Sequence, residues 1–173
     1  MQSHDYVPRP EFMAEAIIEA QKAQAAGDYA IGAVVVRAGK VLASSGNRVK
    51  LDNDPTQHAE IAAIRMACAA AGSRHIEGSI LYTTAEPCPM CAAAAIWARM
   101  AGIVSGSTIG DMTLFRTMTG DPDWTWRTVE VGARQVLGSG EPRLFLIEGF
   151  MRQECCRLFH IGTSPVESPF HLD

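Results

Sequence analysis

The sequence lacks the surplus of positive charge that proteins built to hold DNA or RNA usually carry. Of its 173 residues, 15 are Lys or Arg and 19 are Asp or Glu, which gives a formal net charge of −4. Phosphate binding normally requires a basic surplus, because each phosphate must be neutralised. Clusters of Lys and Arg are also missing near the C-terminus. We therefore expect a small-molecule substrate and do not expect a nucleic-acid partner.

Long apolar runs are also missing. No stretch approaches the ~20 consecutive apolar residues that a membrane-spanning helix needs. The first residues, Met1 to Tyr6, contain neither the basic segment nor the apolar segment of a secretory signal peptide. These absences predict a cytoplasmic protein without a membrane partner.

Cysteines are few and odd in number, since the chain has 5 of them. Without a signal peptide, such a set is typical of a reducing compartment rather than of a disulfide framework. We interpret Cys88 and Cys91 as thiolate metal ligands. The other three, Cys68, Cys155 and Cys156, are expected to pack as small buried hydrophobic residues.

Apolar periodicity and turn residues predict helices that alternate with strands. Such an order predicts an α/β fold in which a central mixed sheet is covered on both faces. We expect a single domain over residues 1–173 with a loose tail at 161–173. Residues 112–126 give the weakest pattern, and 129–140 fit a strand or a helix. The predicted helices span 10–26, 57–71, 89–100 and 149–159, and the predicted strands span 33–37, 40–45, 79–84, 102–106 and 143–147.

Two short motifs carry the chemistry. They are His58-Ala59-Glu60 and Pro87-Cys88-Pro89-Met90-Cys91. His58, Cys88 and Cys91 are good zinc ligands, and the Glu60 carboxylate is left over. A structural zinc site usually closes its fourth position with a Cys or His, whereas a catalytic site leaves it to water and places an acid–base group nearby. The motifs therefore predict a catalytic zinc site.

The spacing of the residues within the two motifs restricts where their helices can begin. Cys88 and Cys91 are three residues apart and share one face of a first helical turn, where unpaired N–H groups favour thiolates. Residues two apart lie on nearly opposite sides of a regular helix. His58 and Glu60 can therefore approach one metal only if their helix begins near His58. The turn-rich residues 53–56 supply suitable capping chemistry.

Three alternatives stay open for the motifs. The zinc site could be structural, with His75 or another Cys as fourth ligand, the spacing could arise by chance, or the chain could be a zinc-stabilised binding module without turnover. The spare Glu60 favours catalysis. In that case a metal-activated water attacks a ring carbon that bears an amino group. Glu60 takes the proton from the water, delivers it to the ring nitrogen and assists the loss of ammonia.

The blocks 53–60, 86–91 and 96–99 resemble the cytidine-deaminase-like superfamily of zinc deaminases. Over roughly residues 10–115 they are most similar to bacterial guanine deaminases, and next to tRNA adenosine deaminases. The resemblance implies a three-layer α/β/α fold with a five-stranded mixed sheet and one zinc ion in each chain. It also implies a homodimer or larger assembly in which a neighbouring chain helps to shape the pocket.

The resemblance further implies substrate contacts. Asn47 matches the loop asparagine that binds the base, unless it is only a turn residue. Ile31 stands where such guanine deaminases carry an aromatic residue. Trp97 could equally belong to the core of its helix, and the tryptophans of 112–128 could form an aromatic lid or ordinary loop packing. Further contacts are expected from Ala33, Ala59, Glu86, Trp97, Trp124 and Trp126.

Together these features predict a zinc-dependent hydrolase that deaminates a free amino-substituted nitrogen heterocycle. Guanine is the leading substrate, which places the chain in purine nucleobase metabolism. Another small ring, such as cytosine, creatinine or an aminotriazine, and adenosine in tRNA are the alternatives.

Overall fold

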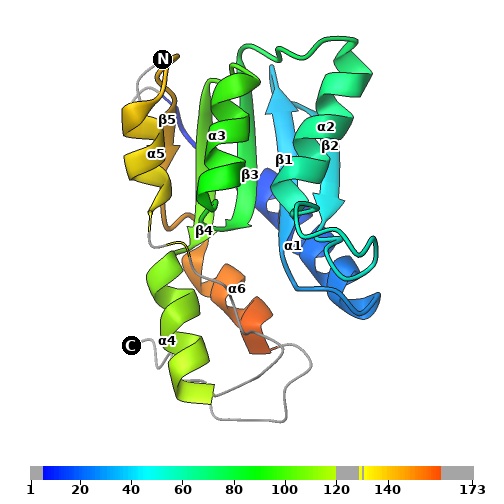
Figure 1. Cartoon of the computed structure of the whole chain (residues 1–173), viewed down its shortest axis with the longest axis vertical. Helices are drawn as coiled ribbons and strands as arrows, with labels where there is room; N and C mark the ends of the chain where they lie inside the picture. The colour runs from blue at the N-terminus through cyan, green and yellow to red at the C-terminus, as the bar shows by residue number, and fades with distance from the viewer. Residues whose placement is uncertain (1–5, 120–128, 130, 161–173) are drawn as a thin grey trace.

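The computed structural model describes residues 6–119, 129 and 131–160 and shows helices packed on both faces of one sheet (Figure 1). The predicted tail at 161–173, Trp124 and Trp126 lie outside these residues. The elements are α1 (Pro10–Ala25), β1 (Gly32–Arg37), β2 (Lys40–Gly46), α2 (Ala59–Ala71), β3 (Ser79–Ala85), α3 (Pro89–Trp97), β4 (Gly102–Ser107), α4 (Ile109–Thr119), α5 (Ala133–Ser139), β5 (Phe145–Ile147), α6 (Arg152–Arg157) and the 3-10 helix η3 (Leu158–His160).

The sheet is mixed, as predicted. Its strand order is β2-β1-β3-β4-β5. The hairpin β1–β2 and the pair β1–β3 are antiparallel, whereas β3, β4 and β5 run parallel. Because parallel strands end at the same edge, the residues that follow β3 and β4 are brought to one end of the sheet.

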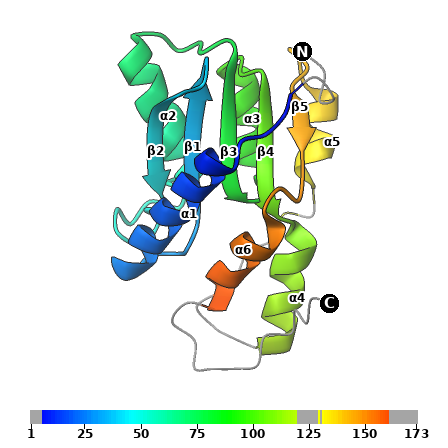
Figure 2. The ribbon, with the colours of Figure 1, turned by 180° about the vertical axis from the view of Figure 1, so that it is seen from behind.

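Strand residues alternate between two apolar layers, because successive side chains of a strand point to opposite faces. Val35, Leu81 and Ile103 pack with α2, α3 and α5 on one face. Val34, Tyr82 and Val104 pack with α1 and the α6 residue Cys155 on the other. Figure 2 shows the second layer, with α1 crossing the sheet and α6 below it. The three-layer α/β/α prediction is confirmed.

Helix α2 meets the demand set by the His58–Glu60 spacing. It begins at Ala59 with His58 as its N-cap and ends at Ala71. Its C-cap is Gly72, whose φ of 60° is the left-handed geometry that glycine adopts readily. Helix α3 begins at Pro89 with Cys88 as N-cap and ends at Trp97, three residues before the predicted end at 100. The two motifs therefore lie at the N-termini of these two helices.

Two helices go beyond the sequence-based expectation. Residues 109–119 form α4 where the pattern is weakest, and 133–139 form α5 where strand and helix are both open. Helix α4 begins with a reciprocal cap: Asp111 accepts from the backbone N–H of Thr108 at 2.8 Å, and the Thr108 hydroxyl accepts from the N–H of Asp111 at 3.1 Å. This cap starts the helix although Gly110 and several threonines are poor helix formers.

Among the described helices, none has the length and apolar character that crossing a lipid bilayer requires. The apolar residues instead gather in the two layers beside the sheet.

Candidate metal centre

His58, Cys88 and Cys91 meet at one point although 30 or more residues separate the histidine from the cysteines. His58 Nδ1 lies 3.6 Å from each of the two sulfurs, and the sulfurs lie 3.6 Å from one another. All three potential ligand atoms fall within 4.8 Å of one another. Within the described residues no fourth ligand joins this group, so closure by His75 is not observed.

The two helix N-termini build the centre. Cys88 and His58 are N-cap residues with extended backbones, so their side chains lie in front of the first turns of α3 and α2. Cys91 is in the first turn of α3 and is fully buried. The unpaired N–H groups of the two first turns, and the positive ends of the helices, favour negatively charged sulfur at this point.

The pKa values of the two cysteine thiols are shifted in opposite directions. Contact with the Cys91 thiol, against the opposing effect of burial and with help from His58, lowers the pKa of Cys88 to about 4. The same contact, together with burial, raises the pKa of Cys91 well above its ordinary value. A metal cation bound by the two sulfurs and the imidazole would stabilise both cysteines as thiolates. One nitrogen and two sulfurs suit zinc, with its fourth position left open.

Glu60 lies beside the three ligands and is 3% exposed. Burial raises the pKa of Glu60 to about 7, although the neighbouring His58 ring lowers it. Strongly shifted carboxyl groups of this kind gather at functional sites, because catalysis needs groups that can both take and give a proton. The position and burial of Glu60 are therefore consistent with the acid–base role that the sequence predicts for it.

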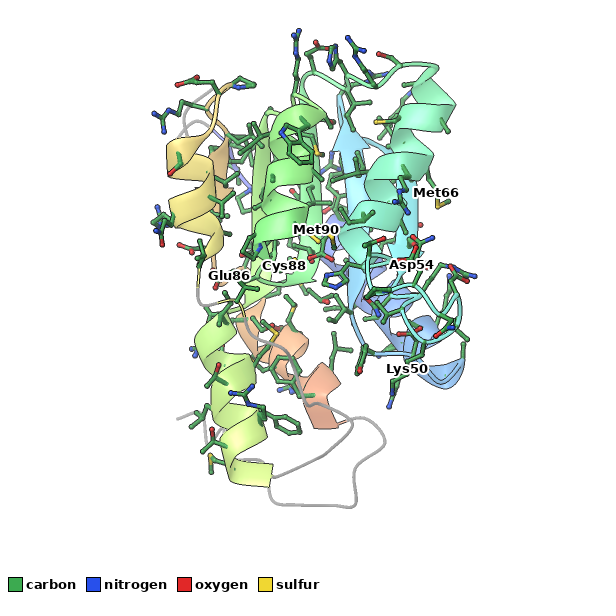
Figure 3. The ribbon with its side chains drawn as sticks, viewed as in Figure 1. Lys50, Asp54, Met66, Glu86, Cys88 and Met90 are labelled. Atoms are coloured by element: carbon green, nitrogen blue, oxygen red, sulfur yellow. The ribbon has the colours of Figure 1, made fainter. Side chains whose placement is uncertain are left out.

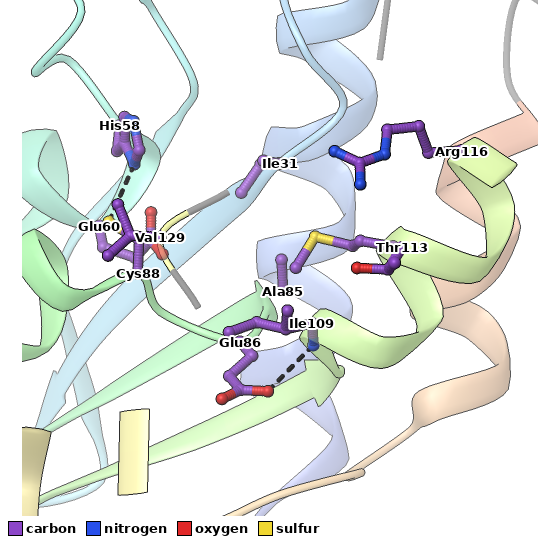
Figure 4. A pocket seen from close by; sticks show the side chains of 11 residues that line it. Ile31, His58, Glu60, Ala85, Glu86, Cys88, Ile109, Thr113, Arg116 and Val129 are labelled. Carbon is purple, nitrogen blue, oxygen red and sulfur yellow. Dashed lines mark hydrogen bonds between the residues drawn. The ribbon is translucent and has the colours of Figure 1, made fainter. Parts of the chain in front are cut away.

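A pocket opens next to the metal centre (Figures 3 and 4). Cys88 lies at the start of α3 on the side of the metal centre, Glu86 lies next to Ile109 at the start of α4, and Thr113 and Arg116 of α4 form the wall opposite Cys88. Its lining is mostly apolar, with a few polar groups that converge on the space, as is usual for a small-molecule site. The lining residues are Ile31, His58, Glu60, Ala85, Glu86, Cys88, Ile109, Met112, Thr113, Arg116 and Val129.

Of the predicted substrate contacts, Ile31 and Glu86 line this pocket. Ala33, Asn47 and Ala59 are not among its described walls. Ala33 of β1 and Ala59, the first residue of α2, are fully buried in the apolar layer between the sheet and the helices α2 and α3. The contacts expected from these three residues remain predictions.

Trp97 lies outside the pocket of its own chain. It is the last residue of α3, eight positions after the first, so it sits roughly 12 Å along the helix from the metal end. Its side chain is 75% exposed, so it does not belong to the core either. With Ala93, Ile96 and Val136 it lines a separate shallow hollow.

Asn47 is held by Asp28. The Asn47 amide donates to Asp28 Oδ1 at 2.8 Å, and the N–H groups of Tyr29, Lys50 and Leu51 also donate to the Asp28 carboxylate. Burial would raise the pKa of Asp28, but these hydrogen bonds, that of Asn47 first, outweigh it and lower the pKa. The Asn47 backbone N–H donates to the carbonyl of Ile31 at 2.9 Å. Asn47 is thus fixed next to a pocket residue.

Glu86 uses both carboxylate oxygens to hold backbone. Oε2 accepts from the N–H of Ile109, and Oε1 accepts from the N–H of Ala133, each at 3.0 Å. These two N–H groups belong to the first residues of α4 and α5. The structure therefore gives Glu86 a bracing role that the sequence does not suggest.

The α4 wall is the part of the site that sequence reasoning missed. Four of its residues recur at the spacing of one helical face and line the pocket, namely Ile109, Met112, Thr113 and Arg116. A signal was present, because Thr108-Ile109-Gly110-Asp111 fits the pattern of a hydroxyl residue followed three positions later by an acidic residue, which is typical of a helix start.

Comparison with known proteins agrees with this site. The family model for the cytidine and deoxycytidylate deaminase zinc-binding region matches residues 8–107. A tRNA-specific adenosine deaminase of Agrobacterium fabrum is 50% identical over 99 residues, which cover 57% of this chain and 65% of the relative. A guanine deaminase of Bacillus subtilis is 52% identical over 68 residues, which cover 39% of this chain and 44% of the relative. The matched regions thus span less than two thirds of either relative.

The solved structures include one from a study of A-to-I editing by tRNA:A34 deaminases at the wobble position of transfer RNA. It superposes with a TM-score of 0.69 and 38% sequence identity, covering 87% of this chain and 99% of the other. The residues 8–107 that match the family model contain both metal-binding motifs and the first four strands of the sheet. The chain therefore belongs to the cytidine and deoxycytidylate deaminase zinc-binding family.

Proposed function

We propose that this protein is a zinc-dependent hydrolytic deaminase of a free purine base, with guanine as its substrate. One observation carries the proposal. Three potential zinc ligands lie within 4.8 Å of one another, next to a buried carboxylate, at the wall of a mostly apolar pocket. A binding module without turnover would have no use for a buried ionisable group such as Glu60 at that place, because burying it costs free energy.

His58, Cys88 and Cys91 would hold the metal. Zinc bound there supplies the Lewis acidity that activates a water for attack on a ring carbon. Glu60 accepts a proton from that water and delivers it to the adjacent ring nitrogen. It then assists departure of the amino group, so that water is consumed, a carbon–oxygen bond replaces the carbon–nitrogen bond, and ammonia leaves.

The rest of the pocket binds the ring. Its apolar surface comes from residues that include Ile31, Ala85, Ile109 and Met112. A flat heterocycle gains by leaving water between such walls. Asn47, fixed by Asp28, is proposed to bind the base, as are the backbone groups of Ala59.

Guanine is favoured by the net charge of −4 and by the 52% identity to the Bacillus subtilis guanine deaminase. A free base carries no phosphate, so its enzyme needs no basic surface. Cytosine, creatinine and aminotriazines share the required amino-substituted ring, and a substrate panel separates them from guanine.

Adenosine in tRNA is the second candidate. It is favoured by the 50% identity to the Agrobacterium fabrum enzyme and by the 38% identity of the superposed solved structure. Because of these similarities, the expectation that the protein has no nucleic-acid partner is not supported. The acidic net charge does not decide the question, since a local basic groove can coexist with it.

The substrate panel tests the proposal. Zinc-loaded protein is incubated with guanine, adenine, cytosine, creatinine, an aminotriazine, the nucleosides and tRNA, and ammonia release is measured with and without a chelator. We expect release from guanine that the chelator abolishes and added zinc restores. Release from tRNA with none from guanine would support the second candidate instead, and no release from any substrate would favour a binding module.

A further inference from the structure

The polar groups that line the pocket come from several elements. His58, Cys88 and Glu60 lie at the metal centre. Glu86 lines the pocket and accepts the first backbone N–H groups of α4 and α5. The other polar side chains among the described lining residues are Thr113 and Arg116 of α4.

Arg116 faces the metal centre across the pocket. Figure 4 shows its side chain extending from α4 toward Ile31, with His58 and Cys88 further on in the same direction, at the far side of the pocket. Among the described lining residues it is the sole permanently charged cation. A guanidinium presents five N–H donors in a planar fork, which matches a pair of neighbouring acceptors better than a single one.

A ring that reacts at the metal centre directs its far edge toward α4. In guanine the amino group is on carbon 2, and carbon 5 lies directly across the six-membered ring. The two atoms that flank this far edge are the carbonyl oxygen on carbon 6 and the ring nitrogen 7. Both are acceptors, and together they form the pair that arginine binds in its commonest specific contact with guanine.

Adenine presents a different far edge. Its reacting carbon is carbon 6, and nitrogen 3 lies across the ring, so a single ring acceptor faces α4. A guanidinium fork therefore discriminates between the two purines through the acceptor pair.

We propose that Arg116 is a specificity-determining residue that binds the two-acceptor edge of guanine opposite the reacting carbon. The proposal rests on the proposed function, because it assumes that guanine carbon 2 faces the metal centre. Thr113 lies three residues before Arg116 on the same face of α4 and supplies a hydroxyl to the same wall.

The test compares guanine with 2-aminopurine, which keeps the reactive amino group but lacks the carbonyl oxygen. Wild type, Arg116→Met, Arg116→Lys and the control Arg134→Met are loaded with zinc. Arg134 lies on α5 outside the pocket and is paired with Glu148. The ratio of kcat/KM for guanine to that for 2-aminopurine is then measured for each protein.

We expect Arg116→Met to lose ~10-fold to ~100-fold of this ratio, the discrimination that a bidentate arginine–guanine contact provides. Arg116→Lys keeps the charge but not the fork, so it should recover only part of the ratio. Arg134→Met should keep the wild-type ratio. An equal loss on both substrates in Arg116→Met, or an unchanged ratio, would overturn the proposal.

Binding separates this proposal from the proposed function. Guanine and 2-aminopurine are titrated calorimetrically into the zinc-loaded Glu60→Gln protein, with and without Arg116→Met. If the protein prefers guanine and this preference depends on Arg116, the contact is supported. If the wild type releases no ammonia from guanine, guanine is overturned as the substrate, but the contact between Arg116 and guanine still stands. Equal affinity for the two bases overturns the role of Arg116 whatever the turnover.

Discussion

At the scale of single residues, replacing Glu60 should abolish proton transfer without removing a zinc ligand, whereas replacing any of the three ligands should weaken zinc binding. It is buried beside them, so replacing its carboxylate with an amide of the same shape removes the proton carrier and leaves the ligands in place. The two functions, holding the metal and moving the proton, can therefore be separated by one substitution.

We predict that Glu60→Gln binds zinc in wild-type amount and loses turnover by about 10²- to 10⁴-fold, the usual contribution of a general acid–base group. Metal content is measured by atomic emission and turnover by ammonia release. Glu77→Gln is the matched control, because Glu77 is exposed and pairs with Arg99 away from the pocket. Near wild-type turnover in Glu60→Gln would contradict the role.

At the scale of secondary-structure elements, α4 is the wall that must be held at a fixed distance from the metal centre. Two carboxylates do this. Glu86 accepts from the first N–H of α4, and Asp111 joins α4 to Arg152 at the start of α6. Both contacts are long-range in sequence, so the wall depends on tertiary structure.

Glu86→Gln should leave zinc binding unchanged and raise KM for the substrate more than it lowers kcat. The amide retains one acceptor in place of two, so one N–H of α4 or α5 loses its partner and the wall shifts. Misplacement of this kind costs about 10-fold to 100-fold in kcat/KM. Steady-state kinetics with zinc analysis measure the effect. Glu148→Gln, which alters an exposed pair outside the pocket, should behave as wild type. A Glu86→Gln protein with an unchanged KM would argue against the brace.

The Asp111–Arg152 pair predicts a pH-dependent stability. Burial would raise the pKa of Asp111, but hydrogen bonds from Arg152 and Thr108 outweigh it and lower the pKa below the ordinary 3.8. A carboxyl whose pKa is lowered by folding stabilises the fold above its unfolded pKa, and this stabilisation is lost as the pH falls through the folded pKa.

Asp111→Asn should therefore lower the melting temperature at neutral pH, and the difference from wild type should shrink below about pH 4. Loss of a buried charge-assisted hydrogen bond costs about 1–3 kcal/mol. Thermal unfolding followed by circular dichroism, from strongly acidic to neutral pH, measures it. Arg134→Met removes an ion pair whose arginine is 71% exposed and should change little at any pH. A deficit that persists undiminished at low pH would contradict this account.

At the scale of the whole molecule, the exposed tryptophan at the end of α3 bears on assembly. Trp97 is 75% exposed and lines a shallow hollow whose apolar part includes Ile96 and Val136, beside the polar Gln135 and Glu141. Large exposed apolar surface of this kind often marks an interface. We propose that a second copy of the chain covers it, in line with the assembly that the family resemblance implies.

Trp97→Glu should then shift the protein from dimer to monomer, because a buried charge without a partner is costly at an interface. Light scattering coupled to size-exclusion chromatography gives the mass. Ile18→Glu is the control, since Ile18 is 49% exposed on α1, which covers the opposite face of the sheet. A wild-type monomer, or a Trp97→Glu dimer, would refute the proposed interface.

The sequence by itself determined the metal centre. A histidine as N-cap of one helix, and two cysteines three apart at the start of another, are local patterns whose geometry follows from the first turn of a helix. The order of helices and strands likewise predicted the mixed sheet covered on both faces, because helices that alternate with strands pack on the two sides of a sheet.

Only the tertiary structure decided the pocket. Arg116 and Glu86 are 30 residues apart, and Trp97 is close to Cys91 in sequence, yet the first two line the pocket and Trp97 lies outside it. The reason is physical. The helix face that meets the metal centre depends on long-range packing and on two carboxylates. Glu86 accepts from backbone N–H groups, which no residue type reveals, and Asp111 accepts from Arg152, 41 residues away.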